Sequence, residues 1–135
     1  MALPAEDRTA ITELVYLHGH LIDGGELNRL DELFTPDVVY DVTDLGQEPL
    51  RGIDELRQAA LALGDLNPVG HHVTNLVLTE VGADRVRARS KGIGINADGT
   101  CGSVTYDDDI VRTRDGWRIA YRRVAARRTP LGRQP

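Results

Sequence analysis

The stretch Gly70-His71-His72-Val73-Thr74-Asn75-Leu76-Val77-Leu78 marks the point at which the chain changes from helical to extended patterns. Its aliphatic and β-branched residues predict a β-strand that begins with two adjacent histidines. Neighbouring strand residues point to opposite faces. We therefore expect one histidine to face the interior and the other to face away. An imidazole in an apolar interior is a candidate proton carrier near neutral pH.

Three helices are predicted before this strand, with a short strand at residues 38–42 between the second and the third. The first has one apolar stripe, with His18 in its middle, and ends at Asp23-Gly24-Gly25. The stripe consists of Ile11, Leu14, Val15, Leu21 and Ile22. The second helix presents Leu27, Leu30, Leu33 and Phe34 and ends at Thr35-Pro36-Asp37. The third covers about residues 53–63.

After these helices, strands are predicted at residues 71–80, 85–96, 100–114 and 117–126. In the second of them Arg85, Arg87, Arg89 and Lys91 alternate with small residues, which indicates one solvated face and one covered face. The last two strands form a hairpin across Asp115-Gly116. With that turn, Arg122 would oppose Asp109 and Arg123 would oppose Asp108.

Helices segregated from antiparallel strands indicate the α+β class. We expect the three helices of the N-terminal half to pack in a strongly curved, mostly antiparallel sheet, with a cavity between sheet and helices. The length of 135 residues fits a single domain, 1–135. Loops 43–52 and 64–69 would shape the cavity.

Composition excludes several function classes. The net charge of −5 argues against nucleic acid as the main partner. The chain has no apolar run near the roughly 20 residues of a membrane span, and its N-terminus does not read as a signal peptide. A single cysteine, Cys101, fits a reducing cytoplasm, so a cytoplasmic location is expected. No zinc-ligand spacing is present, and the aspartates at 107–109 alternate faces, so charge pairing explains them better than a metal does.

Five segments together resemble the nuclear transport factor 2-like superfamily, specifically its SnoaL-like branch. The segments are residues 23–34 (DGGELNRLDELF), 37–40 (DVVY), 50–52 (LRG), 71–75 (HHVTN) and 114–119 (RDGWRI). The resemblance implies a cone-shaped α+β barrel of cystatin-like topology. It also implies a homodimer or homotrimer, a small-molecule ligand, and no cofactor or metal. Members include dehydratases, isomerases, polyketide cyclases, epoxide hydrolases and a hexachlorocyclohexane dehydrochlorinase, and some are non-catalytic.

The dehydrochlorinase pattern fits best, residue by residue. It implies that His71, Asp23, His18 and Arg122 are catalytic, with His18 where that pattern has a lysine. In chemical terms, His71 would act as general base, Asp23 would orient it, and His18 and Arg122 would stabilise developing negative charge. We expect Tyr16, Tyr40, Val73 and Asn75 to contact the substrate. The pattern of scytalone dehydratase is similar in pairing an aspartate near the end of the first helix with strand histidines.

The function expected on this basis is a cofactor-independent lyase, dehydratase or isomerase acting on a small apolar cyclic substrate. The ketosteroid isomerase pattern fits badly, because its general-base position falls on Val42 rather than Asp41. A polyketide cyclase or an epoxide hydrolase would use the same cavity. The epoxide hydrolase pattern is an aspartate–arginine–aspartate set on strands, and Arg89 and Asp109 match it only when the alignment is forced. A non-catalytic ligand-binding or oligomerisation module, like the small subunit of a dioxygenase, would not need Asp23, His18 and His71 to converge.

Each of the four catalytic candidates also has a purely structural interpretation. His71 could be a satisfied packing residue of its strand, and His18 could be a hydrogen-bonded core histidine. Asp23 precedes two glycines and could be only a turn residue. Arg122 could serve only as the cross-strand partner of an aspartate.

Overall fold

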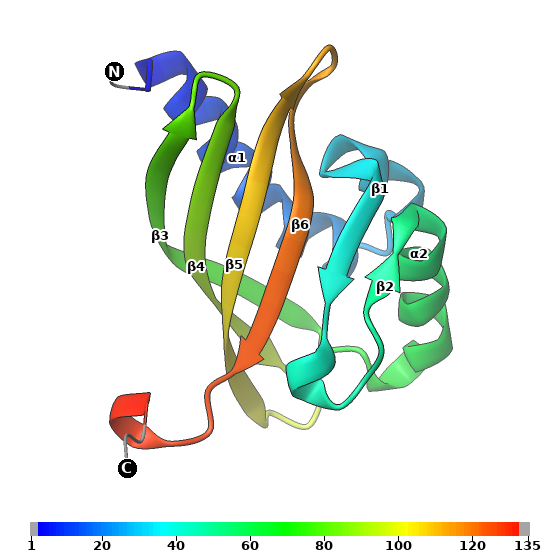
Figure 1. Ribbon diagram of the computed structural model, residues 1–135. Helices are drawn as coiled ribbons and strands as arrows, with labels where there is room; N and C mark the ends of the chain where they lie inside the picture. Colours follow the sequence, from blue (N-terminus) through cyan, green and yellow to red (C-terminus); the bar gives the residue numbers. More distant parts are fainter. Residues whose placement is uncertain (1–2, 133–135) are drawn as a thin grey trace.

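The computed structural model describes residues 3–132 and combines α-helices with one six-stranded sheet (Figure 1). The α-helices are α1 (Ala5–Asp23) and α2 (Gly52–Leu63). The strands are β1 (Phe34–Asp41), β2 (Leu50–Arg51), β3 (Gly70–Gly82), β4 (Arg85–Ile95), β5 (Cys101–Thr113) and β6 (Gly116–Ala126). The short 3₁₀ helices are η1 (Leu27–Glu32), η2 (Thr43–Leu45), η3 (Gly64–Leu66) and η4 (Pro130–Gly132).

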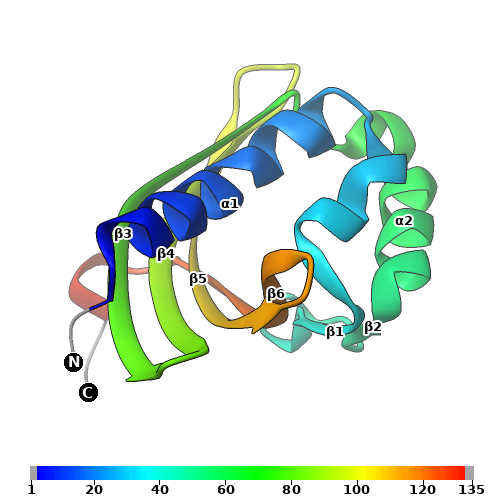
Figure 2. The same cartoon turned by 90° about the horizontal axis from the view of Figure 1, so that it is seen from above.

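The strand order in the sheet is β2-β1-β6-β5-β4-β3, and every neighbouring pair is antiparallel except β1 with β6. The sheet curves around α1, while α2 covers the side formed by β1 and β2 (Figure 2). The predicted α+β class and curved sheet are confirmed. The sheet does not close into a barrel, because β2 and β3 stay separate edges that do not pair with each other.

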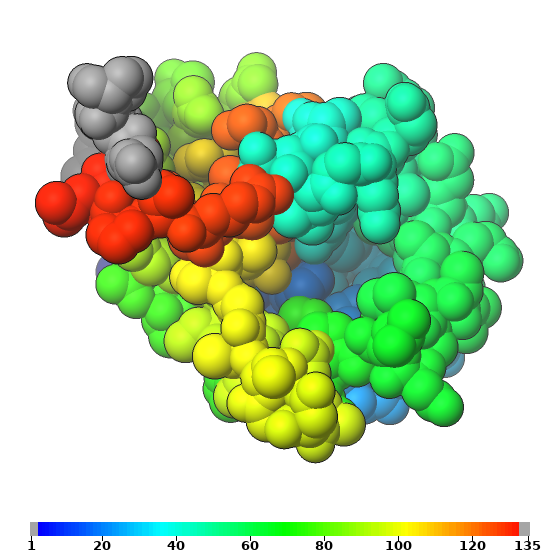
Figure 3. All heavy atoms as spheres, turned by 90° about the horizontal axis from the view of Figure 1, so that it is seen from below, coloured from blue at the N-terminus to red at the C-terminus, as the bar shows by residue number. Residues whose placement is uncertain are grey.

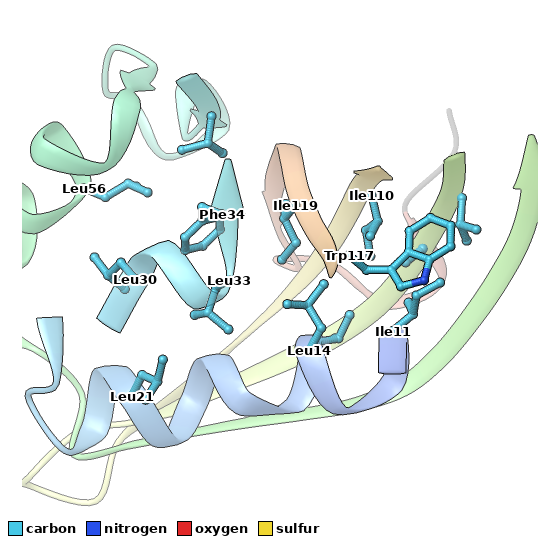
Figure 4. Packing of buried hydrophobic residues seen from close by; sticks show 14 of the residues in the cluster. Ile11, Leu14, Leu21, Leu30, Leu33, Phe34, Leu56, Ile110, Trp117 and Ile119 are labelled. Atoms are coloured by element: carbon cyan, nitrogen blue, oxygen red, sulfur yellow. The ribbon is translucent and has the colours of Figure 1, made fainter. Parts of the chain in front are cut away.

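Helix α1 forms the floor of the core. Its buried residues recur at intervals of three and four, which places them on one face of the helix. They are Ile11, Leu14, Val15, His18, Gly19 and Leu21. Figure 4 shows Ile11 and Leu14 of this face directed toward Trp117, Ile110 and Ile119 of the sheet. One core therefore joins the helix to the concave face of the sheet.

The second predicted helix differs from the structure. It is the short η1, and β1 already begins at Phe34, four residues before the predicted strand. Leu33 N donates to Leu30 O in a tight 3₁₀ bond, and Ile119 N donates to Leu33 O. Since Pro36 disfavours a helical conformation at Thr35, the chain gains more by pairing with β6 than by extending the helix.

The β5–β6 hairpin also differs from the prediction. Thr113 pairs with Gly116, so the turn residues are Arg114 and Asp115. The Thr113 hydroxyl accepts from the Asp115 N–H and donates to the Gly116 carbonyl, which closes the turn one residue earlier than predicted.

An additional residue in β6, Ala120, then shifts the register of this hairpin. As a result Arg122 opposes Asp108 rather than Asp109, and Arg123 opposes Asp107 rather than Asp108.

Strand β3 presents its two histidines to opposite sides, as strand alternation predicts. His71 is half-buried on the concave side, and His72 is exposed. A bulge after Thr74, with Asn75 in the left-handed region at φ 56°, reverses the alternation. The inward positions then become Leu76 and Leu78.

Candidate active site

A cavity of about 460 Å³ lies between α1, α2 and the concave face of the sheet. Figure 3 shows the hollow from below, with blue α1 at its base and the cyan and green segments at its rim. The apolar lining residues are Ile22, Leu30, Phe34, Leu50, Leu56, Ala59, Ala60, Ala62 and Leu63. The polar ones are His18, Tyr40, Gln47, Asn67, His71 and Tyr106. Among residues 3–132, no lysine, arginine, aspartate or glutamate lines this cavity.

His71 and Asp23 form a hydrogen-bonded pair at the wall of the cavity. The distance between His71 Nδ1 and Asp23 Oδ1 is 2.6 Å, and the His71 backbone N–H donates to Asp23 Oδ2 over 2.9 Å. With Nδ1 held by a carboxylate acceptor, the favoured neutral tautomer carries its proton on Nδ1. The ring nitrogen Nε2 is then left with a free lone pair.

The location of Asp23 explains how residues 48 positions apart meet. It is the last residue of α1, and both of its carboxylate oxygens bond to His71. Gly19, one turn earlier, packs against the His71 carbonyl so closely that a side-chain carbon there would overlap it. The missing side chain of Gly19 lets the end of α1 approach β3, and this approach brings the carboxylate to the imidazole.

His18 lies beside this pair and is 4% exposed. Its ring centroid is 5.9 Å from that of His71, and its Nδ1 has no hydrogen-bond partner among the described residues. Burial, and then the electrostatic influence of Arg122 and of His71, hold the pKa of His18 well below its usual range. His18 is therefore neutral at pH 7 and presents an uncharged imidazole, rather than a cation, to the cavity.

Arg122 is fully buried behind the cavity wall and does not line the cavity. Its Nε and Nη2 donate to the two carboxylate oxygens of Asp108 over 2.7 and 2.8 Å. The guanidinium carbon lies 4.2 Å from the centre of the Tyr106 ring and 6.0 Å from that of Tyr40. Arg122 therefore lies behind the rings of these two tyrosines, which separate it from the cavity.

The four residues expected to contact substrate occupy different environments. Tyr40 lines the cavity, and Val73 packs half-buried against the core beside it. Tyr16 is 39% exposed and does not line the cavity. Asn75 sits in the β3 bulge, exposed, where its side chain accepts a hydrogen bond from Thr74.

Sequence reasoning missed Tyr106 and the α2 part of the cavity wall. Gln47 and Asn67 do come from the two loops expected to shape the cavity. The signal for Tyr106 was the alternation of β5, in which Tyr106, Asp108 and Ile110 are all buried. Helix α2 could be predicted as a helix, but its cavity-facing residues depend on where tertiary packing puts it.

The aspartates flanking Asp108 lie on the other face of the sheet. Asp107 pairs with Arg89 and Asp109 pairs with Arg85, so neither Arg89 nor Asp109 reaches the cavity. Within residues 3–132 no group of three histidine, cysteine or acidic side chains is arranged to hold a metal ion. No helix in this range is long and apolar enough to cross a membrane.

Comparison with known proteins gives relatives along most of the chain. A family model described as a SnoaL-like domain matches residues 4–123. An uncharacterised protein of Mycobacterium tuberculosis is 33% identical over 129 residues, covering 86% of this chain and 82% of the relative. The structure of an NTF2-like protein with a cystatin-like fold from Novosphingobium aromaticivorans is 29% identical, with a TM-score of 0.76, and covers 93% of this chain and 85% of its own. LinA shares the fold, at 20% identity and a TM-score of 0.76 over 95% of this chain and 93% of LinA.

Proposed function

The chain belongs to the SnoaL-like domain family, and from this premise we propose that it is a cofactor-independent lyase, dehydratase or isomerase. In this proposal His71 and Asp23 act as a general acid–base pair on a small, apolar cyclic substrate. The observation that carries it is the 2.6 Å contact between His71 Nδ1 and Asp23 Oδ1 at the wall of a cavity of about 460 Å³.

The position of Asp23 supports a chemical role for this pair. A carboxylate in the last turn of a helix opposes the helix dipole, so it is not placed there to stabilise α1. It also makes no local turn bond, because both oxygens bond to His71. Its side chain fixes the orientation of the imidazole and neutralises the charge that the ring gains when it accepts a proton.

The reaction step follows from this arrangement. His71 Nε2 takes a proton from a carbon or hydroxyl of the bound ring, and the electron pair left behind moves into the ring system. The imidazolium stays paired with the Asp23 carboxylate and later returns the proton to the product or to a leaving hydroxyl. A positioned general base contributes about 10²–10⁴-fold in rate.

The lining of the cavity supports an uncharged substrate. Burying an ionised group without a charged partner is costly, and none of the lining residues is an acid, a lysine or an arginine. Aliphatic and aromatic side chains provide most of the contact surface. Few polar groups remain to orient the ligand, and three of them, His18, His71 and Tyr106, belong to one cluster of rings.

Exchange of carbon-bound hydrogen in D₂O tests the proposal without knowledge of the natural substrate. The protein is incubated with 2-tetralone, 1-indanone and cyclohexenone, and deuterium uptake is followed by NMR. We expect exchange faster than in buffer, reduced about 100-fold or more by His71→Ala. Asp23→Asn is expected to reduce it as well, because it removes the charge that orients the ring and supports its protonation.

His72→Ala is the matched control, because His72 is the neighbouring histidine but is exposed on the other side of β3. Its exchange rate should equal that of the unchanged protein. Equal rates for His71→Ala and His72→Ala would contradict the role of His71.

We also propose that the chain forms a homodimer or homotrimer in the cytoplasm. The side of the sheet away from α1 carries ion pairs together with exposed Val77 and Tyr121, a mixture suited to an interface between copies. Light scattering after size-exclusion chromatography would distinguish a monomer from either oligomer.

A further inference from the structure

We propose that Tyr106 is the hydrogen-bond donor that holds a carbonyl or hydroxyl oxygen of the substrate ring, which makes oxygenated, uncharged ring compounds the ligand class. This inference rests on the proposed function, since it assigns the substrate class of the same cavity. It depends on three features of Tyr106: where its ring lies, what fixes the ring, and what its hydroxyl lacks.

Tyr106 belongs to the same cluster of rings as the acid–base pair. Its ring centroid is 6.1 Å from that of His18, which in turn is 5.9 Å from that of His71. The other cavity tyrosine, Tyr40, packs instead against Phe34 at 6.0 Å. A ligand seated between these rings can therefore touch His71 and Tyr106 at the same time.

Two contacts fix the ring of Tyr106. The Arg122 guanidinium stacks on it at 4.2 Å, and Asp108 holds that guanidinium through two hydrogen bonds. The ring also lies against Gly92 of β4, where a side-chain carbon would come within 2.5 Å of Cε2 and 2.9 Å of the hydroxyl oxygen. Only glycine at position 92 leaves room for the phenol in this orientation.

Tyr106 is 5% exposed, and its hydroxyl makes no hydrogen bond to another described residue. The hydroxyl oxygen is not one of the fully buried side-chain atoms that lack a partner, so it is accessible from the cavity. The hydroxyl belongs to the wall of the cavity, so a ligand oxygen can supply the missing bond. Burial raises the pKa of Tyr106, with the neighbouring Tyr40 acting in the same direction, so the phenol keeps its proton and can donate.

The chemistry gives this bond a purpose in the proposed reaction. When His71 removes a proton from the carbon next to a carbonyl, the C–H electron pair forms a C=C bond. The carbonyl π electrons move onto oxygen, which gives an enolate. A neutral donor aimed at that oxygen stabilises the charge as it forms, without a fixed cation in the cavity.

Binding of 2-naphthol compared with naphthalene tests the assignment by fluorescence titration. The two probes differ only in the hydroxyl group. The unchanged protein should bind 2-naphthol more tightly than naphthalene. Tyr106→Phe should weaken 2-naphthol binding about five- to tenfold, the usual range for one neutral hydrogen bond, and change naphthalene binding less than about twofold.

Tyr121→Phe is the matched control, since Tyr121 is the exposed tyrosine of β6 whose hydroxyl bonds to Asp41. It should change neither affinity. The assignment is overturned if the unchanged protein does not prefer 2-naphthol, or if Tyr106→Phe weakens both probes equally or neither. The assay involves no proton transfer, so its outcome is independent of the exchange test on His71.

Discussion

Two carboxylate–base pairs, one at the wall of the cavity and one buried behind it, are built in opposite ways. In the pair of Asp108 with Arg122, both side chains are completely buried and the cation is bound through two parallel hydrogen bonds. In the pair of Asp23 with His71, the side chains are 27% and 17% exposed, and the base has a nitrogen left over. The first pair holds permanent charges in the core, whereas the second holds a titratable group at a cavity wall.

The difference distinguishes a pair that supports the core from the pair that we propose to act on a substrate. Guanidinium does not lose its proton in proteins, so Arg122 cannot move protons in the cavity. Its guanidinium stacks on the Tyr106 ring instead and holds that ring in place. An imidazole does exchange protons near neutral pH, and the single hydrogen bond at Nδ1 leaves Nε2 for a ligand. Similar charge pairing thus serves packing at one site and, in the proposed function, proton transfer at the other.

The same substitution in both pairs should produce the largest effects. Asp108→Asn leaves the Arg122 charge buried without a counter-charge, and we expect a loss of about 3–5 kcal/mol in the free energy of unfolding. Asp23→Asn should lower it by only about 1 kcal/mol, the net value of a hydrogen bond. Urea denaturation of the two variants measures both values, and equal losses would contradict the division of roles.

A smaller effect is expected from Gly19→Ala, which alters only the Asp23–His71 pair. Alanine would normally stabilise a helix by about 1 kcal/mol relative to glycine. Here its methyl group overlaps the His71 carbonyl, so we expect a net loss of about 1–3 kcal/mol from overpacking. Gly102→Ala serves as control, because a side-chain carbon there has open space around it.

The Gly19→Ala variant also tests whether the close approach of α1 to β3 is needed for hydrogen exchange. Moving β3 away from α1 should lower the deuterium exchange rate together with stability, whereas Gly102→Ala should leave exchange unchanged. A stabilised Gly19→Ala protein with full exchange activity would mean that the close approach of α1 is not needed.

The smallest effect concerns His18, which lies between the two pairs. Its pKa is lowered in the folded protein, mainly by burial, so the unfolded chain binds a proton there more readily. The free energy of unfolding is therefore not reduced by His18 above about pH 6.5. Below that pH, protonation of His18 in the unfolded chain lowers it by at most about 1.4 kcal/mol per pH unit. Urea denaturation between pH 7.5 and 5 should show this decline, and His18→Gln should show a shallower one. Parallel curves would exclude His18 as the group responsible.

Much of the fold could be predicted from local patterns. The stripe containing His18 gave α1, and the alternation of basic and small residues gave β4 with its solvated and covered faces. The parity of His71 and His72 predicted that one of the two faces inward, and the resemblance, through the spacing from Thr74, singled out His71. These predictions held because helical and strand periods are set by backbone geometry over a few residues.

The errors arose where one side chain or one inserted residue changed a register. Thr113 closes the β5–β6 turn a residue early, and Ala120 then adds a bulge, which together assign Asp108 to Arg122. A one-residue change in register reverses which side chain faces the core, and the sequence carries no strong signal for it. The predicted partner of Arg122 was wrong for this reason.

The sequence by itself determined the class of the fold, the curved sheet with its cavity, and the candidates His71 and Asp23. Only the tertiary structure decided that a glycine at position 19 brings these two into contact, that His18 is buried without a partner, and that Tyr106 completes the ring cluster over Gly92. The physical reason is the separation along the chain of the residues that interact. Periodicity and turns depend on neighbours in the chain, whereas close approach, burial and stacking depend on segments that folding brings together across tens of residues.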